Sequence, residues 1–112
     1  MIKKTNLMKE FMAKILIYGG GKAAKSVIEL LYGDKNIEIA ALVSRNTLRE
    51  GVQYAKELNI ICLDSIQEAL DNNLDFNIIF NLTGEPFYRR KKHILNSGRR
   101  CFFYRVLKVY LI

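Results

Sequence analysis

A glycine-rich turn near the start of the chain has the residue types needed to bind a phosphate. Gly19 permits a sharp turn, Gly21 lets a pyrophosphate approach the backbone, and Ala24 lets a helix pack closely. The first N–H groups of that helix then face the anion. The pattern is G-x-G-x-x-A, which predicts a dinucleotide site formed by Gly19, Gly20, Gly21, Lys22, Ala23 and Ala24. The alternative interpretation is a tight turn that binds nothing.

The residues after the predicted strand 37–43 favour one dinucleotide over another. NAD sites usually have an acidic residue there, which accepts a hydrogen bond from the ribose 2′-OH. This chain instead has Ser44 and Arg45, with Arg49 one turn further on. A hydroxyl and a guanidinium suit a 2′-phosphate. We therefore expect NADP rather than NAD as the cofactor; in the alternative interpretation Ser44 and Arg45 are plain loop residues.

Two polar residues stand at the end of the predicted strand 76–82. Asn81 and Thr83 lie where open parallel sheets bind their ligands, outside the carboxyl ends of the strands. They are predicted to line the same cleft as the glycine turn. Turn and helix-cap chemistry explains these two residues equally well.

Short apolar runs alternate along the chain with segments of helical periodicity. Capping boxes at Thr47–Glu50 and Ser65–Glu68 predict the starts of two of the helices. The first of these helices is expected to carry an apolar stripe that begins at Leu48. The predicted strands are 15–18, 37–43, 60–63, 76–82 and 101–104, and the predicted helices are 22–32, 48–58, 66–71 and 86–96.

This alternation predicts an α/β fold. Strands that are apolar throughout need cover on both faces, and the crossovers between parallel strands are right-handed. We expect a single Rossmann-like, doubly wound parallel sheet of four or five strands with helices on both faces. The expected strand order is 3-2-1-4, with the fifth strand beyond the fourth. The 112 residues then divide into an N-terminal arm, 1–13, and one Rossmann-like domain, 14–112.

The positive charge is concentrated at the end of the chain. Residues 1–85 carry a net charge of −1, whereas residues 86–112, which contain no acid, carry +8. Such a segment can bind nucleic acid, anionic lipid or an acidic partner, or it can be a solvated helix face. We favour the solvated face and do not expect nucleic acid or a membrane as partner. Its apolar residues predict a homo-oligomer or a bound partner chain, with Phe102, Phe103, Val106, Leu107, Tyr110 and Leu111 in the contact.

The cysteine and histidine content argues against several classes of protein. Cys62 and Cys101 do not make a disulfide framework, and no stretch resembles a secretory signal or a membrane span. We therefore expect a cytoplasmic, reducing environment. The single histidine, His93, lies in a basic helix, and no metal cluster or nucleophile–base pair can be assembled. No catalytic residue is identified.

From residue 14 to about residue 98, the sequence resembles the N-terminal half of the Gfo/Idh/MocA oxidoreductase family, named after glucose-fructose oxidoreductase and inositol dehydrogenase. It is also similar to the N-termini of homoserine and aspartate dehydrogenases and to NAD-binding-like modules of bacterial signalling proteins. The resemblance implies an NAD(P)-binding half-domain. It is carried, in family order, by the glycine turn, Ser44-Arg45 and the runs 55–60 (A-K-E-L-N-I), 64–70 (D-S-I-Q-E-A-L) and 74–83 (L-D-F-N-I-I-F-N-L-T).

The family pattern breaks off after the last predicted helix. The family's Glu-Lys-Pro motif, whose lysine is associated with catalysis, and its substrate domain with a catalytic histidine have no counterpart here. We therefore expect an NAD(P)-binding module that senses or carries the cofactor and shows no dehydrogenase turnover alone. The alternative is the truncated or split cofactor half of such an oxidoreductase. Nucleic-acid or membrane-surface binding through the basic segment ranks last.

Overall fold

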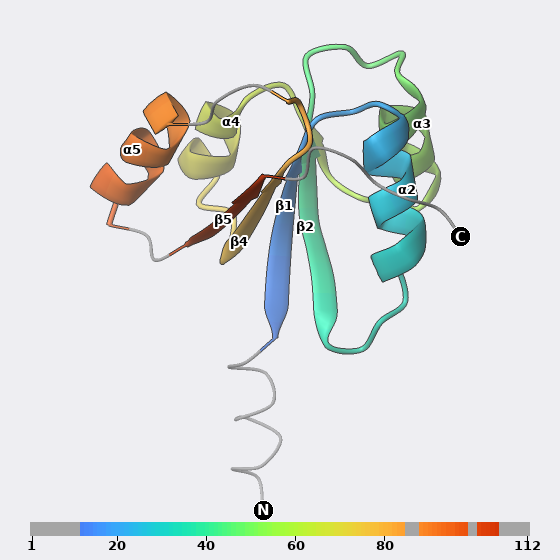
Figure 1. Cartoon of the computed structure of the whole chain (residues 1–112), viewed down its shortest axis with the longest axis horizontal. Coiled ribbons are helices and arrows are strands. Elements are labelled where there is room, and N and C mark those ends of the chain that lie inside the picture. The colour runs from blue at the N-terminus through green and yellow to red at the C-terminus, as the bar shows by residue number, and fades with distance from the viewer. Residues whose placement is uncertain (1–11, 85–87, 99–100, 106–112) are drawn as a thin grey trace, which may run out of the picture.

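The strands and helices form one parallel sheet with helices on both faces, as predicted (Figure 1). The structure is a computed structural model that describes residues 12–84, 88–98 and 101–105. Its strands are β1 (Ala13–Tyr18), β2 (Ile37–Val43), β3 (Cys62–Leu63), β4 (Ile78–Asn81) and β5 (Phe102–Arg105), and its helices are α2 (Lys22–Leu31), α3 (Glu50–Glu57), α4 (Ile66–Asp71) and α5 (Tyr88–Asn96).

The sheet has the order β3-β2-β1-β4-β5, and each strand pairs in parallel with its neighbour. This confirms the predicted order, including a fifth strand beyond the fourth. β1 lies at the centre because the chain winds outward through β2 and β3 and then returns to the other side of β1. The strand order therefore reverses beside β1, which is where open α/β sheets form their binding crevices.

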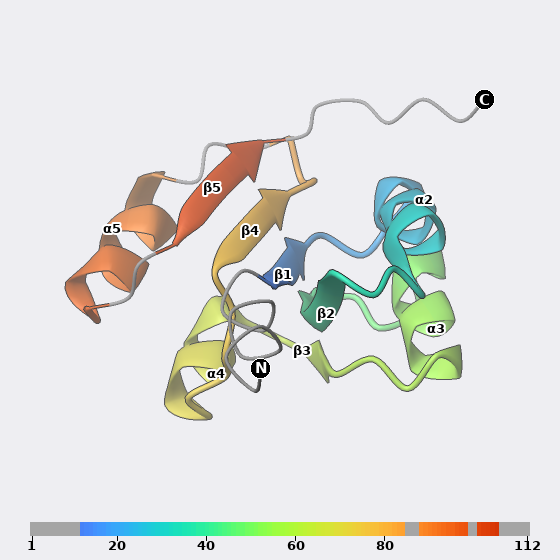
Figure 2. The same cartoon turned by 90° about the horizontal axis from the view of Figure 1, so that it is seen from below.

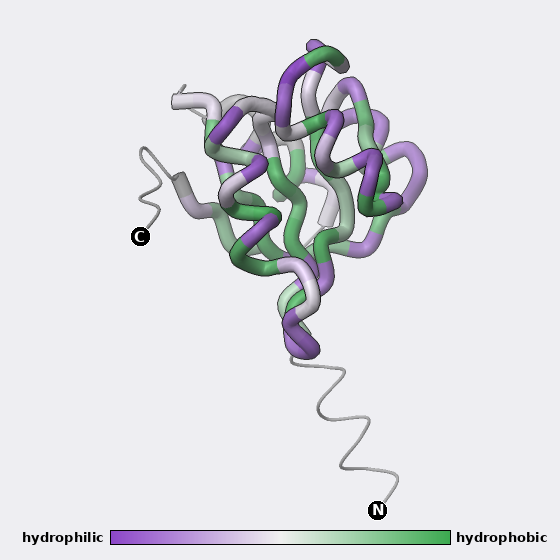
Figure 3. The backbone as a smooth tube through the Cα atoms, turned by 90° about the vertical axis from the view of Figure 1, so that its right-hand side faces the viewer, coloured by the Kyte–Doolittle hydropathy of each residue, from purple (hydrophilic) through white to green (hydrophobic). Residues whose placement is uncertain are grey.

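Each face of the sheet is covered by a different pair of helices (Figure 2). Alternate residues of a strand point to opposite faces, so β1 contributes to two separate hydrophobic clusters. Hydrophobic residues are concentrated along the central strands (Figure 3). Under α2 and α3 the buried cluster is Ile15, Ile17, Ala24, Val27, Ile28, Leu42, Val52 and Ala55, and under α4 and α5 it is Leu16, Ala40, Val43, Ile66, Ala69, Phe76, Ile79 and Ile94.

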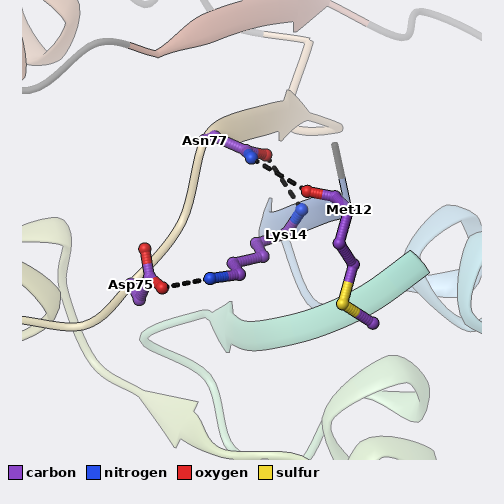
Figure 4. A network of polar contacts seen from close by, with 4 residues as sticks. All are labelled: Met12, Lys14, Asp75 and Asn77. Carbon is purple, nitrogen blue, oxygen red and sulfur yellow. Dashed lines mark hydrogen bonds and ion pairs between the residues drawn. The ribbon is translucent and has the colours of Figure 1, made fainter. Parts of the chain in front are cut away.

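Asn77 joins three strands at the amino edge of the sheet (Figure 4). Its side-chain Oδ1 accepts a hydrogen bond from the Lys14 backbone N–H at 2.9 Å, and its Nδ2 donates to the Met12 carbonyl at 3.1 Å. Its own carbonyl accepts from the Phe102 N–H at 2.9 Å, which adds β5 to the group. Beside it, the Lys14 ammonium pairs with the Asp75 carboxylate.

The capping box predicted at Thr47–Glu50 is wrong. Helix α3 begins at Glu50 with Arg49 as its N-cap, and no side chain caps it. The Asn46 side chain instead accepts a hydrogen bond from the Leu48 N–H at 3.0 Å, which makes a local turn before the helix. Leu48 therefore lies outside the helix and is 83% exposed, although the sequence pattern placed it on the buried stripe.

Strand β2 and helix α4 have the predicted bounds, 37–43 and 66–71, whereas β1 begins two residues earlier than predicted. The capping box at Ser65 is confirmed in part: the Ser65 Oγ accepts a hydrogen bond from the Glu68 N–H at 3.2 Å, but the Glu68 carboxylate accepts from the Asp64 N–H at 3.3 Å rather than from that of Ser65. Strands β3 and β4 are shorter than the predicted runs 60–63 and 76–82. The arm before Met12, the predicted helix start at 85–86 and the apolar residues from 106 onward lie outside the described residues. Within the described ranges, no helix is long and apolar enough to cross a membrane.

Candidate functional site

A cleft of about 440 Å³ opens at the carboxyl edge of the sheet, beside the point where the strand order reverses. It is formed by the turn from β1 to α2, the loop from β2 to α3, and the ends of β3 and β4. Its lining residues are Tyr18, Gly19, Gly20, Gly21, Lys22, Ala23, Ala24, Val43, Ser44, Arg45, Asn46, Arg49, Asp64, Leu82 and Thr83.

The glycine turn has little space for side chains. Gly19 has φ +130°, a conformation that favours glycine, and its N–H donates to the Val43 carbonyl at 2.9 Å. A Cβ on Gly20 would lie 2.8 Å from both Ser44 Cβ and Val52 Cγ2. The first glycine therefore makes the turn, as predicted, and the second lets the turn pack against the end of β2 and the start of α3.

Gly51, in the first turn of α3, attaches that helix to the glycine turn. Its N–H donates to the Gly20 carbonyl at 2.8 Å. A Cβ at this position would lie 2.7 Å from the carbonyl oxygens of Gly20 and Gly21 and 2.8 Å from the Cβ of Ala24. The small size of Ala24 therefore lets α2 approach α3, in addition to covering β1.

The start of α2 gives the cleft its capacity to bind an anion. Gly21 is the N-cap, and its carbonyl accepts from the Lys25 N–H at 3.1 Å. An α-helix leaves the N–H groups of its first turn without helical partners, and its dipole makes that end positive. The first turn of α2 contains no acidic residue to neutralise this end.

The charged residues of the lining strengthen this preference. Lys22, Arg45 and Arg49 are three cations on the wall, against one carboxylate, Asp64. Ser44 lies at the end of β2, where its N–H donates to the Leu63 carbonyl at 2.9 Å. Its hydroxyl lies 3.3 Å from the Asn46 carbonyl and is half-buried at the edge of the cleft.

Asn81 and Thr83 have different positions relative to the cleft. Thr83 is part of the lining, whereas Asn81 is buried and is not. The Asn81 side-chain oxygen accepts hydrogen bonds from the Thr83 N–H at 3.1 Å and from its hydroxyl at 2.6 Å. Asn81 therefore holds the turn after β4, which agrees with the turn chemistry that the sequence left open.

The structure brings the other predicted residues together on one wall. Besides Arg49, which the sequence places one turn after Arg45, the lining contains five residues outside the predicted set: Tyr18, Val43, Asn46, Asp64 and Leu82. Gly51 is a further omission, since it packs against the glycine turn. A glycine near the start of a predicted helix often marks a close approach of another backbone segment. The packing of Gly51 against the glycine turn could therefore have been predicted from the sequence. Asp64 follows the third strand at the same edge, where topology predicts ligand contacts.

Comparisons with protein-family models and with curated proteins found no match for this chain. The resemblance to the Gfo/Idh/MocA family therefore stays a prediction.

Proposed function

We propose that this chain is a dinucleotide-binding module that takes NADP, with NAD as the weaker ligand. The observation that carries the proposal is the cleft itself. A glycine turn, the positive end of α2 and three cations converge at the carboxyl edge, where the strand order reverses. Phosphate groups match both the N–H groups and the charges of such a site.

The preference for NADP rests on the end of β2. Ser44 and Arg45 follow Val43 on the wall of the cleft, and the Arg45 side chain is exposed, so a ligand in the cleft can reach it. A guanidinium provides a planar pair of donors that fits phosphate oxygens, which only NADP offers at the ribose 2′ position. A carboxylate in this place would instead select the free 2′-OH of NAD.

Binding rather than turnover is the proposed activity of the chain alone. Hydride transfer requires a substrate held about 3–3.5 Å from the cofactor and a group placed to move a proton. The described wall of the cleft contributes three cations, glycines, the Asp64 carboxylate and the hydroxyls of Tyr18, Ser44 and Thr83, and we assign these groups to cofactor binding. We therefore expect no oxidation of NADPH with sugars, polyols or aldehydes in an absorbance assay, and turnover above the buffer blank would contradict a pure binding role.

The direct test is calorimetric titration of the purified protein with NADPH, NADH and coenzyme A. We expect NADPH to bind most tightly and NADH more weakly. Arg45→Ala should weaken NADPH by at least about 10-fold and leave NADH within about twofold, since a lost charge-assisted contact is of this size. Lys35→Ala removes an exposed cation on the turn between α2 and β2 and serves as the matched control. Absence of binding by every dinucleotide would overturn the proposal.

A further inference from the structure

The side chain of Arg49 lies across Gly21, at the position that the sequence pattern reserves for a phosphate. A Cβ built on Gly21 would overlap the Arg49 guanidinium, with 2.8 Å to Cζ and 3.3 Å to Nε. The missing side chain of Gly21 therefore makes room for a cation from the start of α3. Gly21 has φ −89°, which any residue adopts, so its backbone conformation does not require glycine.

The backbone around Arg49 fixes it at this place. Arg49 is the N-cap of α3, and Gly51, two residues later, donates its N–H to the Gly20 carbonyl at 2.8 Å. Because Gly51 has no side chain, its backbone lies directly against the carbonyls of Gly20 and Gly21. The guanidinium is therefore delivered to the turn by rigid contacts, although the side chain itself is flexible.

The guanidinium is accessible and has no carboxylate partner among the described residues. The only ion pair found within those residues joins Lys14 to Asp75, at the opposite edge of the sheet. Arg49 is exposed and borders both the main cleft and a second hollow lined by Gly21, Lys22, Ala23, Leu48 and Glu50. Its five N–H donors are thus available to an anion beside the turn.

We propose that Arg49 contacts the pyrophosphate of the bound dinucleotide, an inference that rests on the proposed function. The two arginines then have separate tasks. Arg45 recognises the 2′-phosphate, whereas Arg49 recognises the diphosphate shared by NADP, NAD and ADP-ribose. The ligand class of the Arg49 position is accordingly any nucleoside 5′-diphosphate ester, with or without a 2′-phosphate.

The experiment measures ADP-ribose, which lacks the 2′-phosphate, and NADPH by calorimetry on a set of variants. Arg49→Ala should weaken both ligands by about 10-fold or more, since a charged phosphate contact is lost. Arg45→Ala should weaken NADPH alone. Arg49→Lys, which keeps the charge but not the planar fork, should fall between wild type and Arg49→Ala.

A double-mutant cycle with Gly21 tests the contact itself. Gly21→Ala places a methyl group where the guanidinium lies, so the flexible Arg49 side chain must move away. Its loss of ADP-ribose affinity should approach that of Arg49→Ala. The combined Gly21→Ala/Arg49→Ala variant should lose less than the sum of the two single losses, because both changes remove the Arg49 contact, while the methyl group also narrows the approach of the pyrophosphate. Circular dichroism and urea midpoints confirm that each variant is folded.

The outcomes separate this inference from the proposed function. If wild type binds neither ADP-ribose nor NADPH, both proposals fail. If wild type binds ADP-ribose and Arg49→Ala binds it equally well, the role of Arg49 is refuted while dinucleotide binding stands. If Arg49→Ala weakens NADPH alone, Arg49 recognises the 2′-phosphate and the assignment to the pyrophosphate is wrong. Additive losses in the cycle would show that Gly21 and Arg49 act separately.

Discussion

The two halves of the sheet differ in how their faces are covered. Under α2 and α3, Ile15 and Ile17 of β1 and Leu42 of β2 are buried. Ile78 and Phe80 of β4 are partly buried and pack against that cluster. On the same face of β5, which Figure 2 shows beyond β4, Phe102 is 69% exposed and Tyr104 is 52% exposed. The Phe80 and Tyr104 rings meet edge to face with centroids 5.9 Å apart. Phe102, Tyr104 and Phe80 therefore form one aromatic patch that extends from β5 to β4.

This difference follows from the winding that creates the cleft. Right-handed crossovers leading from β1 to β2 and β3 place their helices on one face, and those leading to β4 and β5 place theirs on the other. In the described parts of the chain, no crossover helix covers β4 and β5 on the face of the sheet that carries α2 and α3. The reversal beside β1 thus forms the cleft at the carboxyl edge, and none of the described helices covers the aromatic face of β4 and β5.

The largest expected effect concerns whether the two halves unfold together. Ile28 of α2 and Ile94 of α5 are both fully buried, one on each face. Replacing either with alanine should lower the free energy of unfolding by about 2–5 kcal/mol, through lost burial and a cavity. Urea titration followed by circular dichroism gives the values, with Leu48→Ala as an exposed control. A separate early transition in Ile94→Ala would show that β4 and β5 form an independent unit.

The next effect tests the close contact on the cleft side. Gly51→Ala should destabilise the fold by about 1–3 kcal/mol, because its methyl group meets two carbonyl oxygens at 2.7 Å and must push α3 from the turn. Glu57→Ala on the exposed surface of the same helix should change stability by less than about 0.5 kcal/mol. Thermal unfolding of both variants provides the comparison, and equal stability of Gly51→Ala and wild type would contradict this packing.

A smaller effect is expected for the exposed aromatic residues of β5, through which we propose that two copies of the chain associate. An edge strand with exposed aromatic residues favours pairing with another chain. The double variant Phe102→Ser/Tyr104→Ser should raise the dimer dissociation constant by at least about 10-fold, or about 1.4 kcal/mol. Sedimentation velocity over a range of concentrations measures it, with Leu30→Ser as the control on exposed α2. A wild-type monomer at every concentration would remove the proposal.

The smallest effect concerns Cys62 on β3. Burial raises the pKa of its thiol, and the Lys56 ammonium opposes the shift in part. Less thiolate is then present near pH 8, so alkylation of Cys62 in a Cys101→Ser variant should be slower in the folded protein than in urea. Because the folded chain holds this proton more tightly, the free energy of unfolding should fall as pH rises past the ordinary cysteine pKa. Lys56→Gln should slow alkylation further, and equal folded and unfolded rates would contradict the shift.

The sequence was sufficient for the sheet but not for the details of the cleft. Strand–helix alternation and the right-handed crossover rule predicted the strand order, because both depend on patterns along the chain. The contact between Arg49 and Gly21 depends instead on how α3 docks, which no local pattern encodes. The capping box at Thr47 failed for a related reason: the Asn46 side chain offers the backbone a competing turn.

The central position of β1 also has a consequence for the order of folding. β1 can pair with β2 soon after the α2 crossover forms, whereas the other edge of β1 stays unpaired until β4 is available. Lys14 and Asn77, which join these strands, are 63 positions apart in the sequence. Contacts between residues so distant along the chain slow folding, because loop closure precedes their stabilising effect. During synthesis, one edge of the central strand therefore stays unpaired until β4 has been made, and an unpaired strand edge is open to pairing with other chains.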